Sequence, residues 1–165
     1  MGRGWQYGAD SRSRGMTASN IRPVTPPAAM AAADIALLEA AQSLLTRVWV
    51  QGRHEVATAL RTVDGRVFQG VHLEGSCRRS SICAEGIAMG AARMGIDPEQ
   101  PLRIDTVVSV QIKPADQFRI IAPCGVCREL ISDYSPEARI WITSDTGVEV
   151  VAALDLLPSK TRRAW

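Results

Sequence analysis

The spacing of apolar residues along the chain changes several times, and each change predicts a new element. Over residues 28–48 the apolar positions recur at helical spacing, which predicts an amphipathic helix. Two β-rich segments, 54–63 and 67–73, flank Asp64-Gly65, a dipeptide typical of a tight hairpin turn. The pattern therefore predicts a helix followed by two antiparallel strands.

The second half of the sequence alternates between the two periods. Helices are predicted at 83–94, about 123–132 and 152–157, and strands at 104–112, 139–143 and 148–151. Such alternation is typical of an α/β protein with helices on both faces of one sheet. The hairpin requires antiparallel neighbours and the later strand–helix–strand units require parallel ones. We therefore expect a three-layer α/β/α fold with a mixed five-stranded sheet.

Residues 1–27 differ from the rest of the chain. They are rich in Gly, Ser, Arg and Pro and have no apolar period, which predicts a flexible N-terminal tail. We expect one catalytic domain over residues 28–160 and a short C-terminal tail over 161–165.

Composition narrows the classes of protein that the chain represents. A length of 165 residues with 46% hydrophobic residues suits one domain that needs no disulfides. The net charge of +2 and an aromatic content of 5% argue against a nucleic-acid partner. No apolar run is long enough to predict a membrane span. Without a visible secretory signal, the cysteines indicate metal ligands or catalytic thiols in a reducing, cytoplasmic protein.

The cysteines lie in two segments with chemical meaning. Cys124 and Cys127 are one helical turn apart, so both thiols can reach one ion. Cys83 lies at the start of another predicted helix and can supply a third sulfur. Three sulfurs leave one tetrahedral position of a zinc ion open, which distinguishes a catalytic zinc from a structural one.

Two further residues complete this hypothesis. Glu85 lies in the first turn after Cys83, where a carboxylate can reach the open position and move protons. Three thiolates on one divalent ion leave a net negative charge, which helix N-termini offset in part. Arg128 is our candidate for the remaining compensation, through hydrogen bonds to sulfur.

Cys83-Ala-Glu followed by Pro-Cys124-Gly-Val-Cys127-Arg resembles the signature of cytidine deaminases and the similar blasticidin S deaminases. The resemblance extends over residues 54–158 and includes Gly65-Arg-Val-Phe-Gln-Gly and Leu156-Leu-Pro. It implies one zinc ion per chain, hydrolytic removal of the exocyclic amine of cytidine, deoxycytidine or a related aminopyrimidine nucleoside, and release of ammonia. It also implies a homo-oligomer, a tetramer or a dimer.

The same resemblance assigns residues to the substrate. Glu74 matches the carboxylate that holds the ribose hydroxyl. His72 stands where the family usually has Asn, and His54 where many members have a stacking Phe. Gly86 replaces an Arg that often follows the Cys-Ala-Glu motif, and Arg78 replaces a common Tyr. These departures make a nucleoside antibiotic of the blasticidin type the alternative substrate.

Two readings from other classes compete with the deaminase. Cys124 and Cys127 match a thiol redox pair at the start of a helix, although Cys83 and Glu85 would then have no role. A structural zinc site closed by Cys77, His72 or His54 is the second competitor. We expect Cys77 to be a bystander, and the sequence leaves the roles of Arg78 and Arg79 open.

Overall fold

The structure is a computed structural model that describes residues 21–77, 80–113 and 116–161. In chain order, its helices and strands are α1 (Ala32–Val48), β1 (Val56–Thr62), β2 (Val67–Val71), α2 (Ala84–Gly95), β3 (Ile104–Ile112), β4 (Phe118–Ile120), α3 (Gly125–Tyr134), β5 (Arg139–Ser144), β6 (Gly147–Ala152) and the 3-10 helix η4 (Ala153–Leu156).

One mixed sheet organises these elements. Its order is β2-β1-β3-β5-β6, with β3 and β5 parallel and the other neighbours antiparallel. These five strands match the predicted number. The short β4 pairs with β3 and is additional, which brings the sheet to six strands in the described residues.

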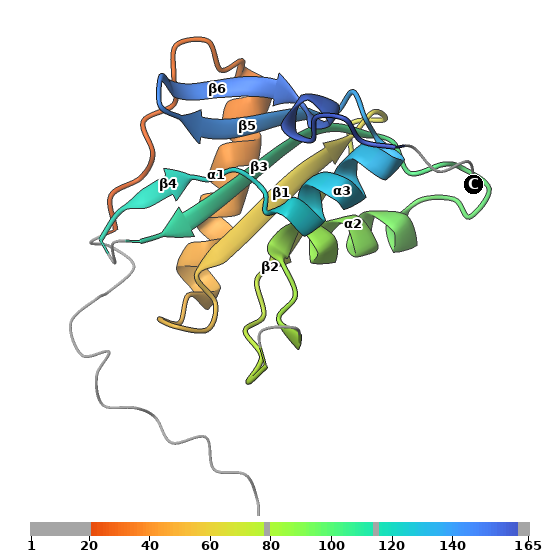
Figure 1. Ribbon diagram of the computed structural model, residues 1–165. Coiled ribbons are helices and arrows are strands. Elements are labelled where there is room, and N and C mark those ends of the chain that lie inside the picture. The colour runs from red at the N-terminus through yellow and green to blue at the C-terminus, as the bar shows by residue number, and fades with distance from the viewer. Residues whose placement is uncertain (1–20, 78–79, 114–115, 162–165) are drawn as a thin grey trace, which may run out of the picture.

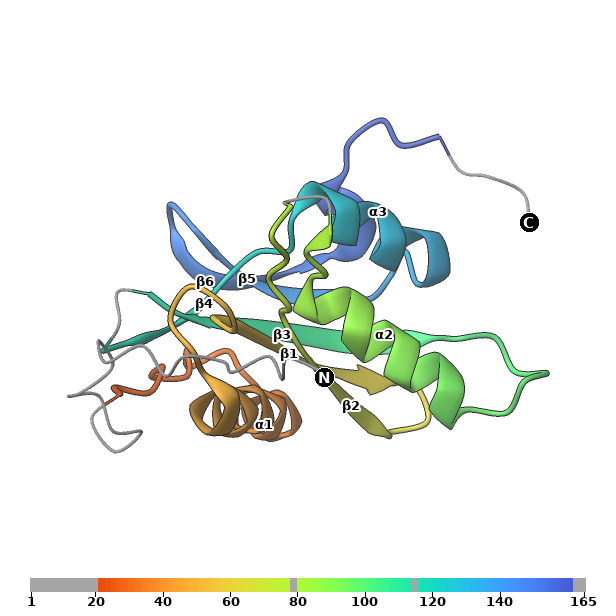
Figure 2. The same cartoon turned by 90° about the horizontal axis from the view of Figure 1, so that it is seen from below.

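The sheet is covered on both faces, as predicted. Figure 2 shows α1 on one side and α2 and α3 on the other. Side chains of the central strands alternate between two cores, because successive residues of a strand point to opposite faces. On β3, Val108 and Val110 pack in the α1 core, whereas Val107 packs in the core of α2 and α3. Figure 1 shows α2 and α3 lying side by side in front of the sheet.

Two glycines fix the hairpin and its distance from α2. Gly65 has a φ of +87°, the left-handed region that the predicted Asp64-Gly65 turn requires. A Cβ on Gly70 would collide with the backbone of Ala84 and Ala88 in α2. The absence of a side chain at Gly70 therefore lets the start of α2 lie directly against β2.

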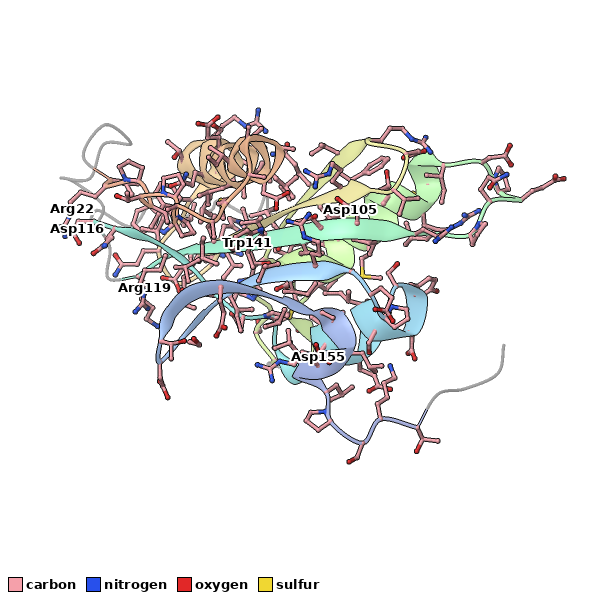
Figure 3. All side chains as sticks on the ribbon, turned by 90° about the horizontal axis from the view of Figure 1, so that it is seen from above. Arg22, Asp105, Asp116, Arg119, Trp141 and Asp155 are labelled. Carbon is pink, nitrogen blue, oxygen red and sulfur yellow. The ribbon has the colours of Figure 1, made fainter. Side chains whose placement is uncertain are left out.

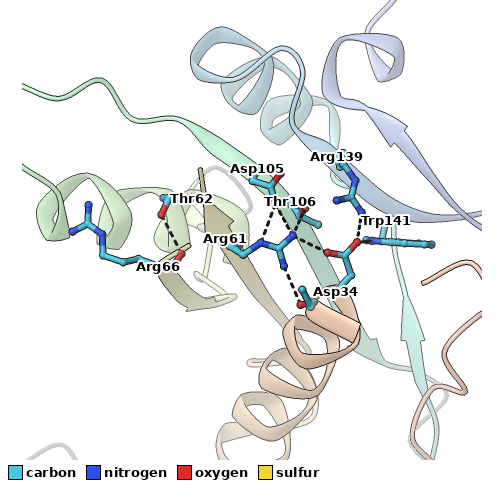
Figure 4. Close-up of polar contacts among 9 residues, drawn as sticks. Asp34, Arg61, Thr62, Arg66, Asp105, Thr106, Arg139 and Trp141 are labelled. Carbon is cyan, nitrogen blue, oxygen red and sulfur yellow. Dashed lines mark hydrogen bonds and ion pairs between the residues drawn. The ribbon is translucent and has the colours of Figure 1, made fainter. Parts of the chain in front are cut away.

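A buried carboxylate ties α1 to the sheet (Figure 4). Asp34 is 1% exposed and accepts hydrogen bonds from Arg61, Arg139 and the indole Nε1 of Trp141. Arg61 also donates to Asp105 at 2.9 Å. Hydrogen bonds to the two aspartates outweigh burial and raise the pKa of Arg61. The network satisfies a charge that burial alone would strongly disfavour.

The structure corrects the predicted ends of some segments. Residues 21–27, which we expected in the tail, lie against the domain: Arg22 pairs with Asp116, and the Val24 amide donates to Gln42. Figure 3 shows Arg22 beside Asp116. Residues 1–20 of the predicted tail and 162–165 of the C-terminal tail fall outside the described residues. Within the described part of the chain, no helix has the length and apolar character needed to cross a membrane.

Candidate active site

Two helix starts meet on the α2 and α3 side of the sheet. Cys83 is the N-cap of α2 and Cys124 is the N-cap of α3, whose first turn contains Cys127. The three sulfur atoms lie within 4.8 Å of one another, and those of Cys83 and Cys124 are 3.5 Å apart. The fold therefore gathers the three predicted ligands into one cluster.

The pKa shifts of the three thiols indicate that the cluster needs a cation before all three can be thiolates. Burial, followed by the neighbouring thiol of Cys124, raises the pKa of Cys83 to about 11. Burial and the charge of Glu85 raise the pKa of Cys127 far above its usual range. Burial also opposes ionisation of Cys124, but hydrogen bonds from the backbone of Cys127 and from the Cys83 thiol lower its pKa. A divalent cation supplies the charge that three thiolates need in this setting.

The cluster offers three candidate ligands, and no fourth joins them among the described residues. His54, His72 and Cys77 are not part of the group. Cys77 is exposed in the loop before α2, and its role as a bystander stays a prediction. A zinc ion held by the cluster would keep a coordination position for another molecule, which fits a catalytic better than a structural zinc site.

Glu85 lies against this cluster. The residue is 4% exposed, and its Oε2 atom accepts a hydrogen bond from the Cys127 thiol at 3.4 Å. Its Oε1 atom accepts a hydrogen bond from the hydroxyl of Ser109 at 3.0 Å. The carboxylate is therefore in direct contact with the sulfur cluster.

A cleft of about 240 Å³ opens onto the cluster. Its lining combines apolar residues with the candidate catalytic groups: Val56, His72, Cys83, Ala84, Glu85, Ile121, Ala122 and Cys124. Mostly apolar walls with a few convergent polar groups are typical of small-molecule sites. The volume suits entry of one heterocyclic ring rather than of a folded macromolecule.

The predicted substrate residues lie next to each other at one side of the cleft. His72 is part of the lining, and its Nε2 atom is 3.5 Å from Oε2 of Glu74. Glu74 is also held by the Ser81 hydroxyl at 2.8 Å. His54 contacts the backbone carbonyl of His72 through Nδ1 at 3.0 Å. His72 thus reaches the cleft directly, while His54 supports its backbone.

Arg128 makes contacts that the sequence did not predict. Its Nε atom donates to the carbonyl of Pro123 at 2.9 Å, and Nη1 donates to the carbonyl of Leu156 at 3.3 Å. The guanidinium therefore fixes the residue just before Cys124 and links it to η4. Hydrogen bonds from Arg128 to sulfur stay a prediction. Gly86 has open space around it, and Arg78 and Arg79 lie outside the described residues.

The site also contains residues that the sequence pattern did not predict, from strands β1 and β3 and from the segment that follows β4. Val56, Ile121 and Ala122 line the cleft, and Ser109 bonds Glu85. Ser109 is one of several polar residues in the strand over residues 104–112, so the sequence did not single it out.

The chain is similar to known proteins over most of its length. It is 34% identical to the blasticidin-S deaminase of Bacillus cereus over 134 residues, which cover 79% of this chain and 93% of that protein. It is 28% identical to a cytidine deaminase of Halalkalibacterium halodurans over 108 residues, 64% of this chain and 76% of the relative. No family model matches the chain.

Solved structures show the same fold. The cytidine deaminase of Burkholderia pseudomallei superposes with a TM-score of 0.64 at 28% identity and covers 80% of this chain and 100% of its own. That of Mycobacterium leprae gives a TM-score of 0.60 at 25% identity and covers 76% of this chain and 97% of its own.

Proposed function

The chain belongs to the cytidine deaminase-like family that includes the blasticidin-S deaminases, and from this premise we propose that it is a zinc-dependent hydrolytic deaminase of aminopyrimidine nucleosides. The observation that carries the proposal is the placement of the Glu85 carboxylate 3.4 Å from one of three clustered cysteine sulfurs. A thiol redox pair needs neither a third cysteine nor a buried carboxylate beside it.

Cys83, Cys124 and Cys127 would hold the metal. Zinc bound there supplies a Lewis acid that lowers the pKa of a water molecule. Glu85 takes a proton at Oε2, which faces the sulfur cluster, and delivers protons to the ring nitrogen and to the departing amine. Water and the aminopyrimidine are consumed, and the corresponding ketone form of the ring and ammonia are released.

The cleft residues orient the ring and the sugar. The apolar side chains of Val56 and Ile121 provide a dry contact surface for a planar base. Glu74 lies 3.5 Å from the His72 ring, and its carboxylate would accept a hydrogen bond from a sugar hydroxyl. These contacts position the exocyclic amine toward the cluster.

Within this class, a blasticidin-type nucleoside is the second candidate substrate beside cytidine and deoxycytidine. The blasticidin-S deaminase of Bacillus cereus is similar over a longer stretch, and at higher identity, than the cytidine deaminase of Halalkalibacterium halodurans. His72 is among the residues that line the cleft, and it stands where cytidine deaminases usually carry an amide. Its ring favours a substrate with an added polar group.

The assembly and the location belong to the same proposal. Apolar side chains are exposed beside the cluster: Leu73 at 41%, Ile82 at 50% and Val126 at 75%. Burying them against a second copy would be favourable, which supports a homo-oligomer, a tetramer or a dimer. Free thiol ligands persist in a reducing compartment, which supports a cytoplasmic location.

The test measures the rate at which the zinc-loaded wild type and the zinc-loaded Glu85→Gln variant release ammonia from cytidine, deoxycytidine and blasticidin S. The amide keeps the size of the side chain but cannot accept the proton, so turnover should fall by roughly two to four orders of magnitude at unchanged zinc content. Equal turnover by the variant, or no turnover of any of these nucleosides by the wild type, would overturn the proposal.

A further inference from the structure

A carboxylate as buried as that of Glu85 depends on the hydrogen bonds that it receives. Its described side-chain donors are the Ser109 hydroxyl, 3.0 Å from Oε1, and the Cys127 thiol, 3.4 Å from Oε2. With 4% of Glu85 exposed, bulk water replaces neither donor. The two oxygens of Glu85 are therefore held by chemically different groups.

Only one of these donors survives metal binding. A cysteine that ligates a metal does so as a thiolate and has no S–H proton to donate. Oε2 then loses its donor and can accept a proton from another molecule. Among the described side chains, Ser109 is then the donor that still fixes the carboxylate, through Oε1.

Ser109 is itself oriented by a second hydroxyl. Thr58 on β1 is paired with Ser109 on β3 in the antiparallel register, and their hydroxyl oxygens are 2.7 Å apart. A serine hydroxyl has one proton. Since Ser109 gives its proton to Glu85, Thr58 is the donor in this bond. Thr58 is fully buried and Ser109 is 2% exposed.

We propose that Thr58 and Ser109 form a hydroxyl relay that positions Glu85, with Oε1 anchored by Ser109 and Oε2 left to carry the proton. This inference rests on the proposed deaminase function. Ser109 and Thr58 are positioning residues, because they act through Glu85 and not on the substrate. A fixed carboxylate reaches the transition state without reorganising, so the relay should affect turnover more than substrate binding.

The kinetic test compares Ser109→Ala, Thr58→Val and the double variant with the wild type. A hydrogen bond to a charged group corresponds to about a 10- to 100-fold effect, so Ser109→Ala should lower kcat by that factor and leave KM within about twofold. Thr58→Val breaks a bond between neutral groups and should cost about two- to tenfold in kcat. The double variant should match Ser109→Ala, because both changes break one chain.

Thr106→Val is the matched control. Thr106 is another fully buried hydroxyl on β3, but it bonds Asp105 and Arg61. It should retain wild-type kcat and KM. A kcat loss in Thr106→Val equal to that in Ser109→Ala, or additive losses in the double variant, would overturn the relay.

A second measurement does not depend on turnover. In zinc-loaded protein labelled with carbon-13 at glutamate carboxyl groups, the Glu85 resonance is identified by its absence in Glu85→Gln. It should shift in Ser109→Ala and stay in place in Thr106→Val. An unchanged resonance in Ser109→Ala would refute the relay. An inactive wild type with the expected shift would refute the deaminase function and leave the hydrogen-bond chain intact.

Discussion

Replacing the buried carboxylate of Asp34 should destabilise the fold without touching the site. Asp34→Asn keeps the size of the side chain but removes the charge that faces Arg61, 2.8 Å away, and Arg139. Breaking one partner of a buried ion pair typically costs about 3–5 kcal/mol. Arg61 keeps Asp105, and the Arg139 side chain is 43% exposed and can be hydrated. We therefore expect the lower end, about 3 kcal/mol.

This loss of unfolding free energy corresponds to a lower melting temperature. For a chain of this size, 1 kcal/mol corresponds to about 2–4 °C, so Asp34→Asn should melt roughly 6–12 °C below the wild type. Differential scanning calorimetry on the zinc-loaded protein measures this shift directly.

Asp116→Asn is the control, because it neutralises the partner of an exposed ion pair with Arg22. Exposed pairs contribute about 0–1 kcal/mol, so the control should melt within about 4 °C of the wild type. Equal melting temperatures of the two variants would show that burial of the Asp34 network adds no stability, and the reasoning would be wrong.

Three further predictions concern the site. His72→Asn should raise the ratio of kcat/KM for cytidine to kcat/KM for blasticidin S, with both values measured by ammonia release. If this ratio does not change, His72 does not select the substrate. Arg128→Ala should weaken zinc binding in a competition titration with a chelator, because it frees the Pro123 carbonyl beside Cys124; unchanged affinity would show that this contact is dispensable. Zinc binding should release protons near pH 7, including those of Cys83 and Cys127, since both pKa values are raised in the metal-free site. Zinc affinity should accordingly rise with pH. Titration calorimetry in buffers of different ionisation enthalpy measures the number of protons released, and a binding enthalpy that is the same in all buffers would contradict the prediction.

The sequence by itself determined those features that depend on residues close together in the chain. Cys124 and Cys127 are one helical turn apart, so their proximity follows from helix geometry alone. The turn at Gly65 and the strand over residues 104–112 also follow from local spacing and composition. The family signature depends on the same short-range patterns, which is why the deaminase function was predictable.

Only the tertiary structure decided which distant groups meet. Cys83 and Cys124 are 41 residues apart in the chain, and their sulfurs lie 3.5 Å apart because two helix starts converge on one side of the sheet. Thr58 faces Ser109 because of the register between β1 and β3, and a slip of β1 by one residue would turn the Thr58 hydroxyl to the opposite face of the sheet. Residues 21–27 have a tail-like composition, yet backbone hydrogen bonds hold Arg22 against Asp116 and Phe118. Strand register and helix placement depend on the packing of the whole core, and local sequence patterns do not encode that packing.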